Sequence, residues 1–405
     1  MDRETSLIQL ATIIKDYRKG ELGFTLGVQH INKWLSQFSQ ENQDVILEET
    51  LHIFENWYFP NEYVDEKIDR IPNYLQKKYG YETIQSLFRS ISFLDLQKDG
   101  NSQHTIMSRF AERIRERYNI SVKTRIEEDI NHYIYFDDGL YTGSRARKDL
   151  QEIISCIPYK STLEVFYIIA CESAFAYTKK IVLEYAEQHG VTLIMHSFKT
   201  IFDDKKSTWS EDGSEETWNL HHNCLWPMPS LKTNEDVHAY IETLKDISKP
   251  SLNYFFRKSN WASDAGIFTS AENRYIVEKE FLIQGIRILE NITEHKGIYP
   301  LGYNVFPSLG LGSFCAFDMN ISNTCPLVLW WGNNNLSGDT LDNWYPLLPR
   351  RVNSREESKL NMDDMVFWDG KSTVDQYNMC PDCGEYFGLE KDGGNGFCID
   401  CALNH

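Results

Sequence analysis

The sequence predicts an α/β protein with a doubly wound, mostly parallel central sheet. Apolar runs of strand length at residues 133–136, 162–170 and 191–195 alternate with amphipathic helical segments, which is the pattern of such a sheet. The length of 405 residues suits two or three domains, so a substantial interior is available. The expected parts are a helical N-terminal region at 1–90, an α/β domain with insertions at 91–350, a linker at 351–375 and a small module at 376–405.

The N-terminal region is predicted to be helical because its apolar residues recur on one face. Ile31 and Leu35 show this spacing, and Ile46, Leu47 and Leu51 lie on a second face of the same kind. Pro60 and Pro72 are expected to punctuate these helices.

Strand-turn-helix units make up the next part of the chain. A short strand at 93–96 leads through a polar turn to a helix at 103–118. A second apolar run, at 133–136, leads to a helix with an apolar face over residues 146–157. The remaining predicted elements are a strand at 162–170, a helix starting at Ser173, a strand at 191–195, a helix at 278–289, and strand-like runs near Phe314 and at 326–331.

Composition excludes several classes of protein. The net charge of -18 disfavours nonspecific binding to nucleic acid or to anionic lipid. No stretch approaches the roughly 20 apolar residues that a membrane helix requires, so no membrane partner is expected. The start, Met1-Asp2-Arg3-Glu4, lacks the layout of a signal peptide, and we therefore expect a cytoplasmic protein.

The most informative motif is the apolar run 133–136 with the acids and small residues that follow it. Asp137 and Asp138 stand at the end of the predicted strand, and Thr142-Gly143-Ser144 opens the next helix. Backbone N–H groups at such a helix start favour an anion, and two adjacent carboxylates need partners such as ribose hydroxyls or Mg²⁺. The motif predicts a sugar-phosphate site, and the alternative is an ordinary Asp-Asp-Gly turn.

A second turn of similar character lies one helix upstream, at the start of the predicted helix 103–118. Gly100 and Ser102 stand where backbone and hydroxyl groups could hold a second phosphate group. A sugar bearing a diphosphate needs anion sites at both ends, so the two turns support each other. The residues of this candidate diphosphate turn are Gln97, Lys98, Asp99, Gly100, Asn101 and Ser102.

Four of the nine cysteines lie near the C-terminus in two Cys-x-x-Cys pairs. Cys380 and Cys383 are followed, after fourteen residues, by Cys398 and Cys401. Two such turns supply the four thiolates of a closed, structural zinc site, so the module at 376–405 is predicted to be a zinc ribbon. A cytosolic redox pair and chance clustering are the alternatives. A closed zinc site serves folding or docking rather than catalysis.

The stretch 136–145 resembles the ribose-phosphate signature of type I phosphoribosyltransferases, in which a hydrophobic strand is followed by two acids and a Thr-Gly turn. The resemblance implies that Asp137 and Asp138 are the catalytic pair that orients the ribose. It implies that residues 97–102 take the place of the family's diphosphate loop. The implied loop around the 5′-phosphate comprises Gly139, Tyr141, Thr142, Gly143, Ser144 and Arg145.

The whole chain also resembles phosphoribosyltransferase-like proteins of bacterial antiphage conflict systems, including some associated with retrons. The segments that carry this resemblance are 34–38, 93–103, 309–313 and 344–350. The resemblance implies an effector that acts on 5-phosphoribosyl 1-diphosphate (PRPP) or a nucleotide, with structural zinc and with Mg²⁺ as an expected ion. A defence complex containing a retron reverse transcriptase with its DNA or RNA is the implied partner.

One departure from the family pattern affects the expected activity. Ordinary members carry a long hood over the site, whereas here only residues 119–132 separate the upstream helix from the ribose-phosphate strand. Without a hood the site is wetter, which favours hydrolysis or binding over transfer to a base. Three functions therefore stay open: an enzyme at the anomeric carbon, an inactive PRPP or nucleotide sensor, and an assembly component that docks through its zinc ribbon.

Overall fold

The computed structural model of the chain describes two compact units. The first comprises residues 1–61 and 202–370, and the second comprises residues 62–201 and 371–405. The described residues are 2–97, 102–203, 223–244, 255–257, 263–290, 297–305, 308–332 and 344–350, with the backbone of two short strands at 378–379 and 386–387.

The second unit contains a four-stranded parallel sheet in the order β2-β3-β4-β5, which is also the order along the chain. Its strands are β2 (Ser92–Phe93), β3 (His132–Leu140), β4 (Thr162–Cys171) and β5 (Thr192–Ile201). Its helices are α4 (Asn61–Tyr79), α5 (Ile84–Ser90), α6 (Ser102–Tyr118), α7 (Ser144–Cys156) and α8 (Glu172–Gln188). The alternating α/β pattern and the parallel sheet expected from the sequence are therefore confirmed.

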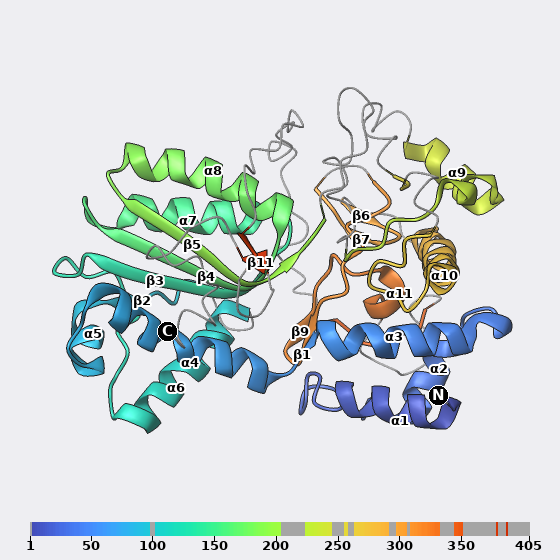
Figure 1. Cartoon of the computed structure of the whole chain (residues 1–405), viewed down its shortest axis with the longest axis horizontal. Coiled ribbons are helices and arrows are strands. Elements are labelled where there is room, and N and C mark those ends of the chain that lie inside the picture. The colour runs from blue at the N-terminus through green and yellow to red at the C-terminus, as the bar shows by residue number, and fades with distance from the viewer. Residues whose placement is uncertain are drawn as a thin grey trace. The chain divides into compact units, whose positions relative to one another are not determined.

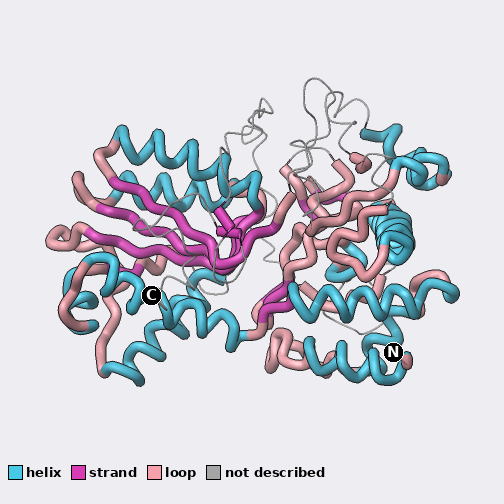
Figure 2. The backbone as a smooth tube through the Cα atoms, in the orientation of Figure 1, coloured by secondary structure: helices cyan, strands magenta, loops and turns pink. Residues whose placement is uncertain are grey.

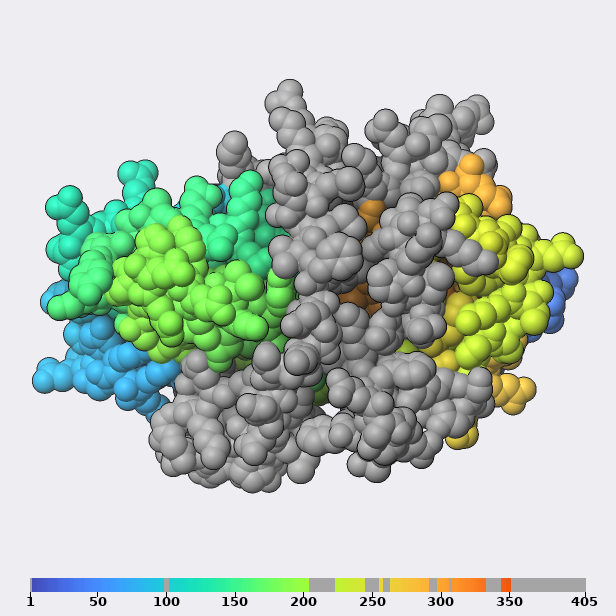
Figure 3. All heavy atoms as spheres, turned by 90° about the horizontal axis from the view of Figure 1, so that it is seen from above, coloured from blue at the N-terminus to red at the C-terminus, as the bar shows by residue number. Residues whose placement is uncertain are grey.

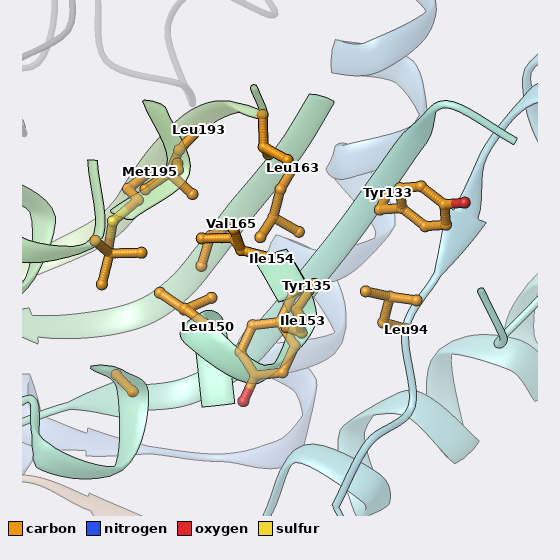
Figure 4. Packing of buried hydrophobic residues seen from close by; sticks show 14 of the residues in the cluster. Leu94, Tyr133, Tyr135, Leu150, Ile153, Ile154, Leu163, Val165, Leu193 and Met195 are labelled. Atoms are coloured by element: carbon orange, nitrogen blue, oxygen red, sulfur yellow. The ribbon is translucent and has the colours of Figure 1, made fainter. Parts of the chain in front are cut away.

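Helices cover both faces of this sheet (Figures 1 and 2). Helices α7 and α8 pack on one face, where Leu150 and Ile154 of α7 join Tyr135 and Val165 of the strands in one buried cluster (Figure 4). Seen from above, α7 and α8 form the teal and green surface of this unit (Figure 3). Because β3 and β4 are buried on both faces, they are nearly continuous apolar runs rather than alternating ones.

Helices α6 and α4 cover the other face of the sheet. The rings of Phe110 in α6 and Phe136 in β3 lie 5.2 Å apart, and those of Tyr74 in α4 and Phe166 in β4 lie 6.0 Å apart. Pro72 lies inside α4 instead of ending a helix as the sequence suggested. Its side chain is buried, so tertiary packing offsets the hydrogen bond that proline removes.

Glu164 ties α4 to this face of the sheet. Its carboxylate is fully buried and accepts hydrogen bonds from Lys78 Nζ at 3.1 Å, Tyr79 Oη at 2.7 Å and His196 Nε2 at 2.7 Å. Residues 62–90 therefore pack with the sheet, whereas the sequence pattern grouped them with the helical N-terminal region. Helical periodicity shows that a helix has an apolar face but not which partner covers it.

The first unit is mainly helical, with short strands. Its helices are α1 (Arg3–Ile14), α2 (Val28–Leu35), η1 (Gln40–Asn42), α3 (Gln43–Trp57), η3 (Pro229–Thr233), α9 (Glu235–Leu244), α10 (Ala271–Leu289) and α11 (Leu327–Trp330). Its strands are β1 (Tyr58–Phe59), β6 (Ile298–Tyr299), β7 (Gly302–Tyr303), β8 (Ala316–Phe317) and β9 (Asn320–Ile321). The helices predicted from the apolar faces of Ile31 with Leu35 and of Ile46 with Leu51 are present as α2 and α3, and the helix predicted at 278–289 is present within α10.

One predicted strand in this unit is wrong. The apolar run at 326–331 forms the short helix α11, in which Leu327, Val328, Leu329 and Trp330 are all buried. Because the run is apolar on every side, its pattern does not distinguish a strand from a buried helical turn.

Strands β10 (Asn378–Met379) and β11 (Tyr386–Phe387) pair antiparallel near the C-terminus. In the part of the chain that the structure describes, no helix has the length and apolar character needed to cross a bilayer.

Candidate functional site

Asp137 and Asp138 lie near the carboxyl end of β3, on opposite faces of the strand. Asp137 shares with Tyr135 the face that α7 covers, and its side chain is almost fully buried, whereas Asp138 is partly buried. In a parallel sheet of this kind, ligands bind beyond the carboxyl ends of the strands. The acid pair therefore occupies the edge at which a site is expected.

Ser102, the first residue of α6, connects the two acids. Its Oγ lies 3.0 Å from Asp137 Oδ1 and 2.9 Å from Asp138 Oδ1. A hydroxyl has one hydrogen to donate, so it satisfies only one of these oxygens when both carboxyls are ionised. Ser102 therefore satisfies both oxygens only when one of the two carboxyls carries a proton that it donates to the hydroxyl.

Gln97, at the other end of the upstream turn, also reaches the acids. Its Nε2 lies 3.2 Å from Asp137 Oδ2 and 3.0 Å from Asp149 Oδ2. One amide group therefore donates hydrogen bonds to two carboxylates. The side chain of Gln103 holds this part of the turn, because its Oε1 accepts from the backbone N–H groups of Leu96 and Gln97, both at 3.2 Å. The structure thus brings the two predicted turns together through their described ends.

Burial makes all three carboxyls of the site costly to ionise. It raises the pKa of Asp137 well above its ordinary value, and the charge of Asp138 raises that pKa further. Burial also raises the pKa of Asp138 and of Asp149, although Arg145 opposes the shift at Asp149. Such a cluster is suited to a ligand that supplies hydroxyl donors or positive charge.

The N-terminus of α7 provides the second half of the site. Gly143 is the N-cap residue and has a φ of 75°, and a Cβ there would lie 2.1 Å from Thr178 Oγ1. Both facts require glycine at this position. Since glycine has no side chain with which to cap the first N–H groups of α7, this helix start is chemically suited to an anion. Thr142 and Ser144, which flank Gly143, are partly exposed.

The segment between α6 and β3 is anchored rather than free. The N–H groups of Phe93 and Asp95 donate to the carbonyls of Lys123 and Thr124, at 2.8 and 3.3 Å. Ser92 Oγ donates to the carbonyl of Arg125 at 2.6 Å. The short segment in the place of the family's hood is thus hydrogen-bonded along β2 and its continuation.

A protein-family comparison matches residues 31–350 of the chain to the family described as PRTase-CE. The chain belongs to the PRTase-CE family. This membership supports a phosphoribosyltransferase-like protein, in agreement with the resemblance noted in the sequence. Neither the curated proteins nor the solved structures that were compared contain a match to this PRTase-CE protein.

Several predicted site residues of this PRTase-CE protein lie outside the described residues. They are Lys98, Asp99, Gly100 and Asn101 of the candidate diphosphate turn, and Cys380, Cys383, Cys398 and Cys401 of the predicted zinc ribbon. Among the residues that are described, no group of three or more His, Cys, Asp or Glu side chains is arranged to hold a metal ion.

Sequence reasoning missed Asp149, Tyr135 and Tyr167 as parts of this region. Asp149 lies one turn along α7 from Arg145, and Arg145 Nε is 3.0 Å from Asp149 Oδ1. The four-residue spacing of a basic and an acidic residue on one helix was the available signal, but surface ion pairs share it. The two tyrosines were hidden inside apolar runs, where core packing is the ordinary role.

Four of the five cysteines before the C-terminal module lie within or beside apolar runs of the sequence, and such positions predict buried small hydrophobic side chains for Cys156, Cys171, Cys315 and Cys325. Cys171, Cys315 and Cys325 are buried as expected. Cys156, at the end of α7, is exposed, so that expectation is wrong for this residue. The last residue of an amphipathic helix can lie on either face, and here Ile153 and Ile154 take the buried positions.

Proposed function

We propose that this protein binds a ribose 5-phosphate compound, either PRPP or a nucleotide, at the carboxyl end of β3. The observation that carries the proposal is the contact of Gln97 and Ser102 with the Asp137-Asp138 pair. This contact supports a single site, because it brings both described ends of the candidate diphosphate turn to the acid pair. Family membership supports the same chemical class.

Each part of the site has a role in this proposal. The N–H groups at the start of α7, with the hydroxyls of Thr142 and Ser144, hold the 5′-phosphate. Asp137 and Asp138 accept hydrogen bonds from the ribose hydroxyls, which replace Ser102 as donors. The carboxylate oxygens also fit Mg²⁺, which prefers oxygen ligands and completes its shell with water and phosphate oxygens. That ion would neutralise a departing diphosphate.

The reaction proposed for this site is displacement at the anomeric carbon, either phosphoribosyl transfer or cleavage of a nucleotide into base and sugar phosphate. Positioning and charge stabilisation supply the catalysis, because no described side chain stands out as general acid or base. The anchored segment at 119–131 specifically favours a second candidate, a sensor that binds the same ligand without turnover. Such a segment is not free to close over a reacting centre.

The double variant Asp137→Asn with Asp138→Asn tests binding. We expect titration calorimetry with PRPP and a panel of nucleotides to show binding by the wild type and at least about tenfold weaker binding by the variant, because charge-assisted hydrogen bonds to the ribose are lost. Asp69→Asn, on α4, is the matched control and should bind as the wild type does. If the wild type bound none of these compounds, the proposed function would be wrong.

Product analysis by mass spectrometry separates the two candidate functions. Release of base, diphosphate or ribose 5-phosphate by the wild type, but not by the double variant, would establish the enzyme. Binding without product after long incubation would establish the sensor.

The biological setting is a further part of the proposal and rests on the resemblance noted in the sequence. We place the protein in the cytoplasm as an effector of antiphage defence that depletes nucleotides, with a retron reverse transcriptase and its DNA or RNA as partner. Unchanged nucleotide pools after expression of the activated protein would contradict this role. The proposed zinc ribbon at 376–405 would serve folding or docking of the same protein.

A further inference from the structure

The four-stranded sheet of the second unit has two unlike edges. At one edge, β2 has only two residues, and the N–H group of Phe93 donates to the carbonyl of Lys123 at 2.8 Å, so a neighbouring segment covers this strand. At the other edge, β5 has ten residues, about twice the length of a common strand. The ladder that the structure describes for β5 is with β4 alone, which makes β5 the outermost strand of this sheet.

A long outermost strand needs protection from other chains. Its outward backbone groups are a template on which another chain can add a strand. Proteins commonly prevent this with proline, with charged side chains or with a covering segment. The sequence of β5 contains no proline, no acidic residue and a single lysine, Lys199. The strand therefore supplies little protection of its own, and a covering segment is expected.

One described element lies against β5 in the same unit. Cα atoms of β11 lie within 8 Å of Cα atoms of β5, and Figure 1 shows β11 beside that strand. Layers that pack face to face are about 10 Å apart, whereas neighbours along a sheet edge are roughly 5 Å apart. This backbone spacing indicates that β11 lies along the edge of the sheet rather than over a face. Residues 371–405, which include β11, belong to the same compact unit as the sheet.

We propose that the C-terminal hairpin formed by β10 and β11 docks on the outer edge of β5 and covers it against strand addition by other chains. The hairpin has its own antiparallel ladder, in which Met379 pairs with Tyr386, so it covers the edge without extending the sheet. Cys380 and Cys383 fall between the two strands in the sequence, so the predicted zinc would hold this hairpin closed. The inference goes beyond the proposed function, because it holds whichever compound the sugar-phosphate site binds.

Two arguments favour a segment of the same chain over a second copy as the occupant of this edge. A tethered segment is present at an effective concentration of about millimolar, which a second copy reaches only in very concentrated solution. The net charge of -18 also opposes association between copies. The described contact of β11 with β5 agrees with both arguments.

Tyr386→Pro in the full chain tests the docking. Proline removes an N–H group and does not fit inside a strand pair, so it should open the ladder between β10 and β11. Hydrogen exchange followed by mass spectrometry is measured for β5 and for β3, which has a neighbouring strand on each side. We expect the outward amides of β5 to exchange at least about tenfold faster in the variant, with unchanged exchange in β3. Cys380→Ser should have the same effect on β5, whereas Cys156→Ser, which changes an exposed cysteine of α7, should have none.

The outcomes distinguish the possible occupants of this edge. Unchanged exchange of β5 in Tyr386→Pro, or equal acceleration in β5 and β3, overturns the proposal. Protection of β5 that disappears on dilution of the wild type, with dimers detected by light scattering, also overturns it and assigns the edge to a second copy. Selective exposure of β5 in Tyr386→Pro supports the hairpin as the cover, even when Cys380→Ser has no effect. PRPP binding is not part of this measurement, so failure of the proposed function and failure of the docking are separate results.

Discussion

Buried charge is the feature that separates the site residues from the core around them. Asp137 is enclosed by Tyr135, Gln97 and Ser102, and burial raises its pKa well above the ordinary value. A group whose pKa is raised on folding stabilises the fold at low pH, below its unfolded pKa of about 3.9. That contribution is lost as the pH rises through the folded pKa. At neutral pH the protein therefore retains a carboxyl that costs stability, which is typical of a functional site.

Asp137→Asn should consequently stabilise the protein at pH 7.5 while it weakens ligand binding. We expect the free energy of unfolding of the second unit to rise by roughly 0.5–2 kcal/mol, since a costly buried acid is replaced by a neutral amide. The advantage should shrink as the pH falls from the folded pKa toward the unfolded one, and should be gone below about pH 4, where the wild-type carboxyl is neutral in both states. Urea unfolding at a series of pH values measures this difference.

The control for this experiment is Asp69→Asn, which also removes one carboxylate. Asp69 is ion-paired with Arg113, whose Nε lies 3.0 Å from Asp69 Oδ1, so its removal should leave stability unchanged or lower it slightly. A lower stability of Asp137→Asn at pH 7.5 would contradict the interpretation of Asp137 as a destabilising functional acid.

At the scale of single elements, much of the second unit could be predicted from sequence because local signals and tertiary packing agree. The strand β3, the glycine turn and α7 follow from an apolar run, Gly143 and a regular apolar face. The partners of Asp137 could not be predicted in the same way. Gln97 reaches Asp137 because parallel pairing brings the ends of β2 and β3 to one edge of the sheet, and the same amide also contacts Asp149 of α7.

Helix α4 shows an element whose position depends on one buried group. Burial alone would raise the pKa of Glu164, but the nearby His132 imidazole, the hydrogen bond from His196 and the charge of Lys78 outweigh it and hold that pKa below its ordinary value. A group whose pKa is lowered on folding contributes stability above its unfolded pKa of about 4.3. This contribution is lost as the pH falls through the folded pKa, so it is fully present at neutral pH.

Glu164→Gln should lower the free energy of unfolding of the second unit by about 3 kcal/mol at pH 7.5, since Lys78 and two imidazoles lose their buried anion. The deficit should narrow only below about pH 4.3. Hydrogen exchange of the backbone amides in β3, β4 and β5 during chemical unfolding measures it, because the tryptophans of the chain all lie in the first unit. Glu66→Gln, at an exposed ion pair with Arg70 on the same helix, should change stability by less than about 0.5 kcal/mol. Equal effects of the two substitutions would show that Glu164 does not anchor α4.

At the scale of the whole molecule, neither unit is a continuous stretch of the sequence. The first unit is built from two distant segments, 1–61 and 202–370, which the sequence assigned to different regions. Tyr17 connects the two segments of this unit, because its hydroxyl donates a hydrogen bond to the carbonyl oxygen of Pro349 at 3.0 Å. Periodicity and turn signals are local, and they carry no information about which distant segments share a core.

The C-terminal module is the part of the molecule for which the sequence alone makes the sharpest prediction. Cys380, Cys383, Cys398 and Cys401 lie outside the described residues, and their spacing predicts about one tightly bound zinc ion per chain. Cys380→Ser should remove that zinc, as measured by plasma mass spectrometry of purified protein, and leave PRPP binding within about twofold, because the proposed ribose-phosphate site uses none of these residues. Cys156→Ser, which changes an exposed cysteine in α7, should keep the zinc.

Zinc-free wild-type protein purified without chelators would contradict the zinc ribbon. Loss of PRPP binding together with zinc would instead show that the module supports the fold of the ribose-phosphate site, because metal binding by such modules is coupled to folding.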